Sequence, residues 1–267
     1  MRSGIMCLIL FAIDCHPKYR LVVAANRDEY YNRETLPAAF WSDNPSILAG
    51  RDLRQGGTWM GITIQGRFCA LTNYRDPSRH KPHAPSRGRL VQRYLEGNTS
   101  PEAFMRDLIN ECDRYNGFNL LAGTPENLYY FSNLEKVIRP LEKGYHGISN
   151  SLLDVPWPKV TRGISWLADC LQQQEINHED LFALMADKEY ADDCDLPNTG
   201  VSREMERMLS SIFIEIPGYG TRCTTILLVD RENRVQFWER SFFHDRPGTW
   251  EDKYYTFRIG ELREACG

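Results

Sequence analysis

A cysteine directly behind a methionine is the first feature of this chain that could do chemistry. Residues 6–15 read MCLILFAIDC, so Cys7 stands at the head of an apolar run. A cysteine thiol can attack an amide carbonyl, and at the start of a chain its own α-amine, with a pKa of about 7.7 to 8.0, can accept the thiol proton. An inert core thiol has the same apolar neighbours. Both interpretations of Cys7 are open at this point.

A dense group of charges follows the next apolar run. The stretch AANRDEYYNR, residues 24–33, places Asn26, Arg27 and Asp28 at the end of a predicted strand. If this strand pairs with the strand of Cys7, the carboxylate can hold an ammonium group and the guanidinium can lower the pKa of the thiol. A charged turn on a solvated hairpin is the alternative.

Two asparagines and one arginine stand at other predicted strand ends. Asn73 in ALTNYR and Asn150 in GYHGISNS carry amide donors of the kind that stabilise an oxyanion, although an asparagine can also simply cap a strand. Arg222 lies at the mouth of the glycine-rich turn PGYGTRCTT, residues 217–225, which lacks the spacing of a phosphate-binding loop.

The elements that must position these residues follow from hydrophobic patterning. Short apolar runs separated by turns predict β-hairpins in the first 75 residues, and strands return over 118–149 and near the C-terminus. Apolar residues three or four apart predict two helices between 89 and 115 and two more at 159–174 and 178–188. This order predicts an α+β fold in which two antiparallel sheets pack face to face with helices outside.

Two polar stretches read as loops. Residues 75–89, RDPSRHKPHAPSRGR, hold three prolines and five Arg or Lys, which predicts an exposed basic loop that could attract an acidic substrate. Residues 189–200, EYADDCDLPNTG, are predicted to form an acidic loop.

Composition excludes several classes of function. The 267 residues suit a single domain, and 32 Lys and Arg against 36 Asp and Glu give a net charge of −4, which argues against nucleic acid as a partner. The apolar runs are far shorter than the roughly 20 residues that span a bilayer, and no signal peptide is visible, so a cytoplasmic protein is expected. The eight cysteines form no zinc pattern, so we expect reduced thiols and no metal site. The sequence carries no signal for an oligomeric state.

Seven blocks of the chain together are similar to a known family. They resemble the NRDE family, also called the Transport and Golgi organisation protein 2 family, and they are MCLILFAID, AANRDEYYNR, GGTWMGIT, ALTNYRDP, YNGFNLLAG, GYHGISNSLLDVPWPK and PGYGTRCTTILLVD. The tetrapeptide NRDE occupies residues 26–29. The resemblance implies an Ntn-hydrolase-like fold, a four-layer αββα sandwich. More distantly, the chain looks like choloylglycine hydrolases and penicillin V acylases, which attack an amide with an N-terminal cysteine.

That resemblance implies roles for individual residues. Cys7 matches the nucleophile, Asp28 the carboxylate after the second strand, Asn73 an oxyanion donor and Asn150 the second asparagine. The distant relatives carry an arginine three residues before the carboxylate, whereas here Arg27 directly precedes Asp28 and Asn26 stands before it. Arg27 and Asn26 are therefore expected only as supporting residues, and Arg222 is the candidate for the late arginine of those enzymes.

Residues 1–6 decide whether this chemistry is possible. We expect them to be an extension upstream of the true start, or to be removed, which leaves one domain over residues 7–267 with Cys7 as its first residue. If they persist, the base is missing, because a peptide nitrogen cannot take up a proton.

A second function follows from the same resemblance. The family is implicated in haem trafficking, which implies a non-catalytic haem carrier that uses the same pocket, whereas hydrolysis of a small amide would require no cofactor. No Cys-x-x-Cys-His motif is present, so haem would be held without a covalent bond. His146 is expected nearest the site, and His80 and His83 in the basic loop could meet the propionates of haem.

Overall fold

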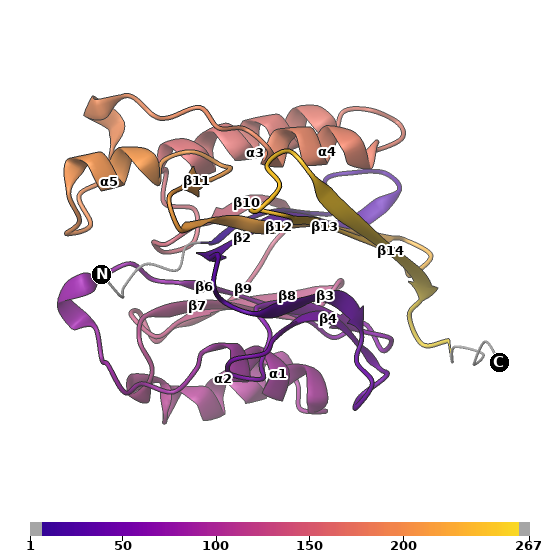
Figure 1. Ribbon diagram of the computed structural model, residues 1–267. Helices are drawn as coiled ribbons and strands as arrows, with labels where there is room; N and C mark the ends of the chain where they lie inside the picture. The colour runs from indigo at the N-terminus through magenta and orange to yellow at the C-terminus, as the bar shows by residue number, and fades with distance from the viewer. Residues whose placement is uncertain (1–6, 262–267) are drawn as a thin grey trace.

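Two antiparallel β-sheets lie face to face in the computed structural model, which describes residues 7–261 (Figure 1). The expected extension over residues 1–6 lies outside the described residues. The first sheet has seven strands in the order β10–β1–β2–β12–β13–β14, with β11 paired to β12. Their bounds are β1 Cys7–Ile13, β2 Tyr19–Tyr30, β10 Gly144–Ile148, β11 Glu215–Ile216, β12 Tyr219–Asp230, β13 Arg234–Phe242 and β14 Trp250–Arg258.

The second sheet also has seven strands, and these follow one another in chain order. They are β3 Thr35–Phe40, β4 Ile47–Asp52, β5 Met60–Thr63, β6 Phe68–Asn73, β7 Phe118–Thr124, β8 Asn127–Ser132 and β9 Ile138–Pro140. Strands β3 and β4 lie between the apolar runs YRLVVAAN and TWMGITI, in a stretch where apolar patterning predicts no strand. Strand β3 contains Pro37 and a register shift against β4, and β4 ends in Gly50, Arg51 and Asp52, so neither strand shows sustained apolar alternation.

Helices cover the outer face of each sheet (Figure 1). Helix α3, Pro158–Cys170, lies on β1 and β10, and α4, His178–Met185, lies on β2 and β12. Helix α1, Gly88–Glu96, lies on β5 and β6, and α2, Pro101–Ile109, lies on β8. The predicted αββα sandwich is therefore confirmed. The short helix α5, Arg203–Met208, follows the predicted acidic loop, which contains a single 3-10 turn at Asp193–Asp195.

Strict alternation along β1 decides which way each side chain points. Ile9, Phe11 and Ile13 pack between the two sheets, whereas Leu8 and Leu10 pack under the helices of the first sheet. All seven residues of the strand are buried, because both of its faces are covered. By the same alternation, Cys7 points toward the second sheet.

The predicted basic loop is anchored at both ends, which corrects the expectation that all of it is exposed. Arg75 is buried, its Nη1 lies 2.7 Å from Glu206 Oε2, and its guanidinium lies over the ring of Trp157. At the other end, Arg87 Nη1 donates to the carbonyl of Gly117 at 2.7 Å. Arg75 is buried and Arg87 is half-buried, and both have these partners because an unpaired charge away from water is costly.

A close backbone contact fixes the far end of this loop. A Cβ atom at Gly57 would lie 2.5 Å from the carbonyl carbon of Gly88, the first residue of α1. The Thr58 amide also donates to the Gly88 carbonyl at 3.3 Å. Since a backbone cannot give way as a flexible side chain can, only glycine fits here, and Arg87 is held at a fixed place beside it.

We predict that Gly57→Ala destabilises the protein by about 1 to 3 kcal/mol, because the added methyl group overlaps backbone atoms of α1. Urea unfolding followed by circular dichroism measures the change. Arg54→Ala, at an exposed position of the same turn, is the control and should stay within about 0.5 kcal/mol. An unchanged unfolding midpoint for Gly57→Ala would contradict the proposed contact.

Candidate active site

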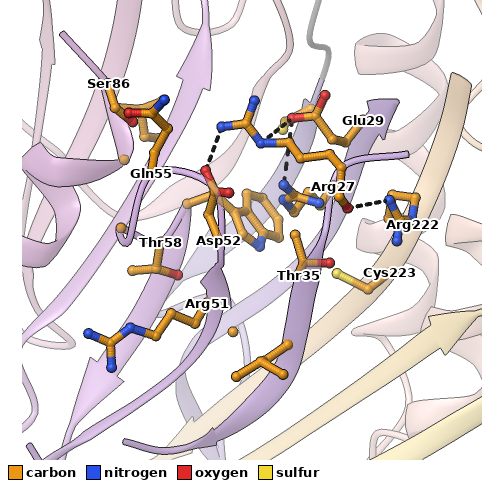
Figure 2. A pocket seen from close by; sticks show the side chains of 18 of the residues that line it. Arg27, Glu29, Thr35, Arg51, Asp52, Gln55, Thr58, Ser86, Arg222 and Cys223 are labelled. Carbon is orange, nitrogen blue, oxygen red and sulfur yellow. Dashed lines mark hydrogen bonds and ion pairs between the residues drawn. The ribbon is translucent and has the colours of Figure 1, made fainter. Parts of the chain in front are cut away.

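A cavity of about 390 Å³ opens between the ends of the two sheets, and Figure 2 shows its polar walls. Its lining comes from both sheets and from the end of the basic loop. Four of the residues expected at the site line this cavity: Cys7, Arg27, Asn73 and Arg222. The structure therefore brings together side chains that are more than 200 residues apart in the sequence.

The register of three neighbouring strands builds one wall. Cys7 on β1 lies opposite Arg27 on β2, and Arg27 lies opposite Cys223 on β12. Residues directly opposite each other in a sheet share a face, so these three side chains form a row across the sheet. All three line the cavity.

A β-bulge in β12 adds a fourth member to this wall. Thr221 pairs with Asp28 and Cys223 with Arg27, which leaves Arg222 as an extra residue without a partner on β2. A bulge lets two successive residues share one face. Arg222 and Cys223 therefore both line the cavity, while Thr221 turns to the opposite face together with Asp28.

Asp28 lies fully buried on the helix side of β2. Thr221 Oγ1 donates to its Oδ1 at 2.7 Å, and its Oδ2 is buried with no hydrogen-bond partner among residues 7–261. Burial raises the pKa of Asp28 to about 7, although the Lys159 cation and the Thr221 hydroxyl oppose that rise. This carboxylate is only half satisfied.

Lys159 faces Asp28 from the first turn of α3. It is buried, and its Nζ donates to the carbonyl of Leu209 at 2.9 Å. Burial lowers its pKa to about 8, and the negative charge of Asp28 counters that effect. Lys159 is not among the residues expected at the site, although a lysine on the apolar face of a predicted helix is a signal for a buried cation.

The Cys7 thiol is a weak nucleophile in this environment. Burial raises its pKa to about 12, the charge of Asp28 adds to the rise, and Arg27 and the backbone amide of Asp28 oppose it. The thiol is therefore protonated near neutral pH and requires a base to attack a carbonyl.

The two asparagines occupy different positions. Asn73 ends β6 and lines the cavity with 8% of its surface exposed. Asn150 is buried behind it and does not line the cavity; its Nδ2 donates to the Asn73 carbonyl at 2.7 Å, and its own carbonyl accepts from the Arg75 amide at 2.9 Å. Asn150 thus holds the strand end that presents Asn73.

The structure does not bring Asn26 to the cavity. Asn26 points under the helices, where its Nδ2 donates to the carbonyls of Met185 and Ile212 at 2.8 and 3.0 Å and its Oδ1 accepts from Thr224. These bonds anchor α4 on β2.

The expected position of His146 at the site is wrong, because its ring packs elsewhere. It stacks on Phe11 with ring centroids 5.1 Å apart, and its Nδ1 lies 2.8 Å from Asp154 Oδ2. His80 lines a second cavity of about 170 Å³, which shares Asn73, Arg87 and Asn116 with the first. His83 is exposed and lines neither cavity.

A buried glutamate ties the two sheets together at the cavity. Glu239 on β13 accepts a hydrogen bond from the backbone amide of Ala38 on β3 at 2.6 Å and from Ser241 Oγ at 3.3 Å. Burial raises its pKa. The sequence carried a signal for it, since Glu239 continues the alternation of the buried Val235 and Phe237 and therefore faces inward.

Within residues 7–261 no group of three or more His, Cys, Asp or Glu is arranged to hold a metal ion. The helices described in this range are also too short or too polar to cross a membrane.

We predict that Lys159→Met raises the pKa of Asp28 above about 7, because the substitution removes a cation that favours the carboxylate. A carboxyl group whose pKa is raised by folding lowers stability as pH rises from its unfolded to its folded pKa, since the folded state keeps a proton that the unfolded chain releases. In the variant this loss continues above pH 7. Burial lowers the pKa of Lys159 in the folded parent protein to about 8. Above that pH the unfolded chain binds more protons than the folded one, so the free energy of unfolding of the parent protein increases as pH rises.

The difference in unfolding free energy between the parent protein and Lys159→Met should therefore widen between about pH 6 and about pH 9, as measured by urea unfolding. Lys188→Met, which removes an exposed lysine paired with Glu215, is the control. A difference that stays constant with pH for Lys159→Met would contradict the coupling of Lys159 and Asp28.

Two of the solved structures that this chain resembles are described as a hydrolase and an amidase. A mutant of the conjugated bile acid hydrolase of Clostridium perfringens gives a TM-score of 0.49 at 9% identity, covering 98% of this chain and all of that one. The N-acylethanolamine-hydrolyzing acid amidase ortholog of Caenorhabditis elegans gives 0.40 at 9% identity, covering 83% and 92%. At this identity neither comparison assigns a role to a residue of this chain.

Comparison of sequences finds proteins with a much higher identity to this chain than the solved structures have. The family model described as Transport and Golgi organisation 2 matches residues 6–244. The Transport and Golgi organization protein 2 homologs of Bos taurus and Homo sapiens are each 34% identical over 275 residues, which covers 95% of this chain and 99% of theirs. Transport and Golgi organization protein 2 of Drosophila melanogaster is 29% identical over 271 residues, or 92% and 95% of the two chains. The chain therefore belongs to the Transport and Golgi organisation 2 family.

Proposed function

We propose that this protein is a cysteine amidohydrolase that becomes active when Cys7 is the first residue of the chain. The observation that carries the proposal is the half-satisfied carboxylate of Asp28. Its Oδ2 is buried without a partner among the described residues, on the strand that pairs with that of Cys7. An α-ammonium group on Cys7 is a cation of the kind that this oxygen lacks.

The chemistry follows from the groups around the cavity. The α-amine of Cys7 takes the thiol proton as the sulfur attacks the amide carbonyl, and the C–S bond forms. The resulting oxyanion accepts a hydrogen bond from the Asn73 side-chain amide. When the C–N bond breaks, the leaving nitrogen receives the proton from the α-ammonium. Water, deprotonated by the same amine, then attacks the thioester carbonyl; the C–S bond breaks, the sulfur takes the proton back from the α-ammonium, and the acid is released.

Asp28 and Arg27 support different steps. The Asp28 carboxylate orients the α-amine and stabilises its protonated form. Arg27 faces the cavity beside Cys7, where its positive charge favours the thiolate. Asn150 acts through Asn73 by holding the carbonyl of that residue. Arg222, which the bulge turns to the cavity, contacts the substrate.

The size of the cavity fits a small amide as substrate. The free thiols of the cysteines fit a reducing location. A volume of about 390 Å³ lies in the usual range for small-molecule sites. The cysteines described by the structure are all free thiols: Cys7, Cys15, Cys69, Cys112, Cys170, Cys194 and Cys223. The proposed nucleophile must stay reduced, and the cytoplasm provides that condition.

The cavity fits a haem carrier less well. Among the described residues no histidine lines it, so Cys7 or Cys223 would have to supply the axial ligand. Burial raises the pKa of both thiols, which opposes the thiolate form that binds iron. We therefore place hydrolysis first.

We predict that a preparation in which intact mass shows Cys7 as the first residue cleaves small fluorogenic amides, whereas one that keeps residues 1–6 does not. Cys7→Ala and Asp28→Asn should abolish turnover, and Asn73→Ala should lower kcat by about 10² to 10³ because it removes an oxyanion donor.

Matched controls test whether these losses are specific. Cys69→Ala removes a buried thiol that does not line the cavity, and Asn98→Ala removes an exposed asparagine. Both should keep parental turnover. Full activity of the longer chain, or of Cys7→Ala, would refute the proposed nucleophile.

We further predict that titration with haem up to tens of micromolar leaves the Soret band of haem unshifted. Absorbance spectroscopy measures this directly. A saturable one-to-one shift that disappears in Cys7→Ala or Cys223→Ala would instead support the haem carrier.

A further inference from the structure

The cavity contains more positive charge than its own carboxylates neutralise. Five arginines line it: Arg27, Arg33, Arg51, Arg87 and Arg222. Three of them have carboxylate partners. Arg33 contacts Glu29 and Asp52 at 3.3 and 2.5 Å, Arg27 contacts Glu29 at 3.6 Å, and Arg51 contacts Asp43 at 2.6 Å. Neither Arg87 nor Arg222 has a carboxylate within 4.0 Å among residues 7–261.

The acids of the cavity are occupied elsewhere. Glu29 is shared by two arginines, and Asp52 is bound to Arg33. Glu239 accepts the Ala38 amide, and burial raises its pKa, which favours its neutral form. Glu251 is paired with Lys253. None of them is placed to neutralise Arg87 or Arg222.

Toward residues 7–261, Arg87 uses one of its five N–H donors, for the Gly117 carbonyl. Burial lowers its pKa to about 10, and the negative charge of Glu29 and of a Cys7 thiolate, when that thiolate forms, opposes the shift. A partly desolvated guanidinium with unused donors facing a cavity is a binding group for an anion.

Arg222 is held in place by neutral groups. Its Nη1 donates to the carbonyls of Tyr30, Tyr31 and Arg33 at 2.9, 3.2 and 3.0 Å, and its Nε is buried without a partner among the described residues. Burial and the charge of Arg27 lower its pKa. Arg222 and Arg87 both line the same cavity, together with Cys7 and Glu29.

We propose that Arg87 and Arg222 form an anion site beside Cys7, so that the amide taken by the proposed hydrolase carries an oxyanion, either a carboxylate or a phosphate. The anion would pair with two half-buried cations that have no carboxylate partner among residues 7–261. The inference rests on the proposed function for the amide, whereas anion binding itself does not depend on hydrolysis.

The test uses the full chain with Cys7→Ala, which cannot turn over an amide. Calorimetric titration compares N-acetylglycine, its neutral amide N-acetylglycinamide, and inorganic phosphate. The carboxylate or the phosphate should bind, and the neutral amide should bind at least about 10-fold more weakly, because each charged hydrogen bond contributes a factor of that order. Comparison of the two anions identifies which oxyanion the site prefers. No binding of either anion, or a neutral amide that binds as tightly as the better of the two anions, would overturn the proposal.

Variants then locate the site. Arg87→Met should weaken anion binding by about 10-fold to 100-fold. Arg87→Lys keeps the charge and should fold even if the methionine variant does not; it should bind more weakly than the parent because the forked donor geometry is lost. The control is Arg79→Met, an exposed arginine of the same loop that does not line the larger cavity. Anion binding that is unchanged in both Arg87 variants, or equally weakened in the control, would refute the assignment.

The two proposals can fail separately. If N-acetylglycine binds through Arg87 but no amide is ever cleaved, the anion site stands and the hydrolase does not. If amides are cleaved with no preference for a charged substrate, the hydrolase stands and the anion site fails.

Discussion

Strand register is the constraint on which the whole cavity depends. Cys7 reaches the cavity because β1 pairs with β2 so that Cys7 lies opposite Arg27, and a shift by one residue would turn the thiol under the helices. The bulge at Arg222 interrupts the alternation of side chains along β12, so that Arg222 and Cys223 lie on the same face. With it, one strand supplies a cavity arginine and, in the preceding position, the hydroxyl that binds Asp28.

Desolvation of charge is the second theme of the site. Asp28, Lys159 and Glu239 are all buried, and each has a pKa displaced toward its neutral form. Such groups are costly to bury and are common at functional sites. Here they lie on both sides of one sheet, with Asp28 and Lys159 under the helices and Glu239 facing the cavity. The sheet between them carries Cys7. The negative charge of Asp28 raises the pKa of the Cys7 thiol although the two side chains lie on opposite faces of the sheet.

Much of this arrangement could be predicted from the sequence, because local patterns encode it. Apolar alternation gave the strands of the first sheet, helical spacing gave α1 to α4, and the family blocks marked Cys7 and Asp28. What could not be predicted depends on contacts between distant segments. The bulge at Arg222 leaves no trace in composition, and Arg87 looks like any other arginine of a polar loop until Gly57 and Gly88 bring it to the cavity. His146 was misplaced because β10 runs away from the cavity: His146 lies opposite Phe11, on the same face as Cys7 but four residues farther along β1.

The bond between Glu239 and the Ala38 amide has a consequence for how a ligand is received. It joins an inner strand of one sheet to the edge strand β3 of the other, across the cavity wall, through a carboxylate sealed from water. The separation of the sheets at this point is thus set by a short polar crosslink as well as by apolar packing. A ligand therefore enters between walls whose spacing is already fixed, and its binding has little cost for ordering the protein. The fixed spacing also selects ligands by their thickness, independently of their charge.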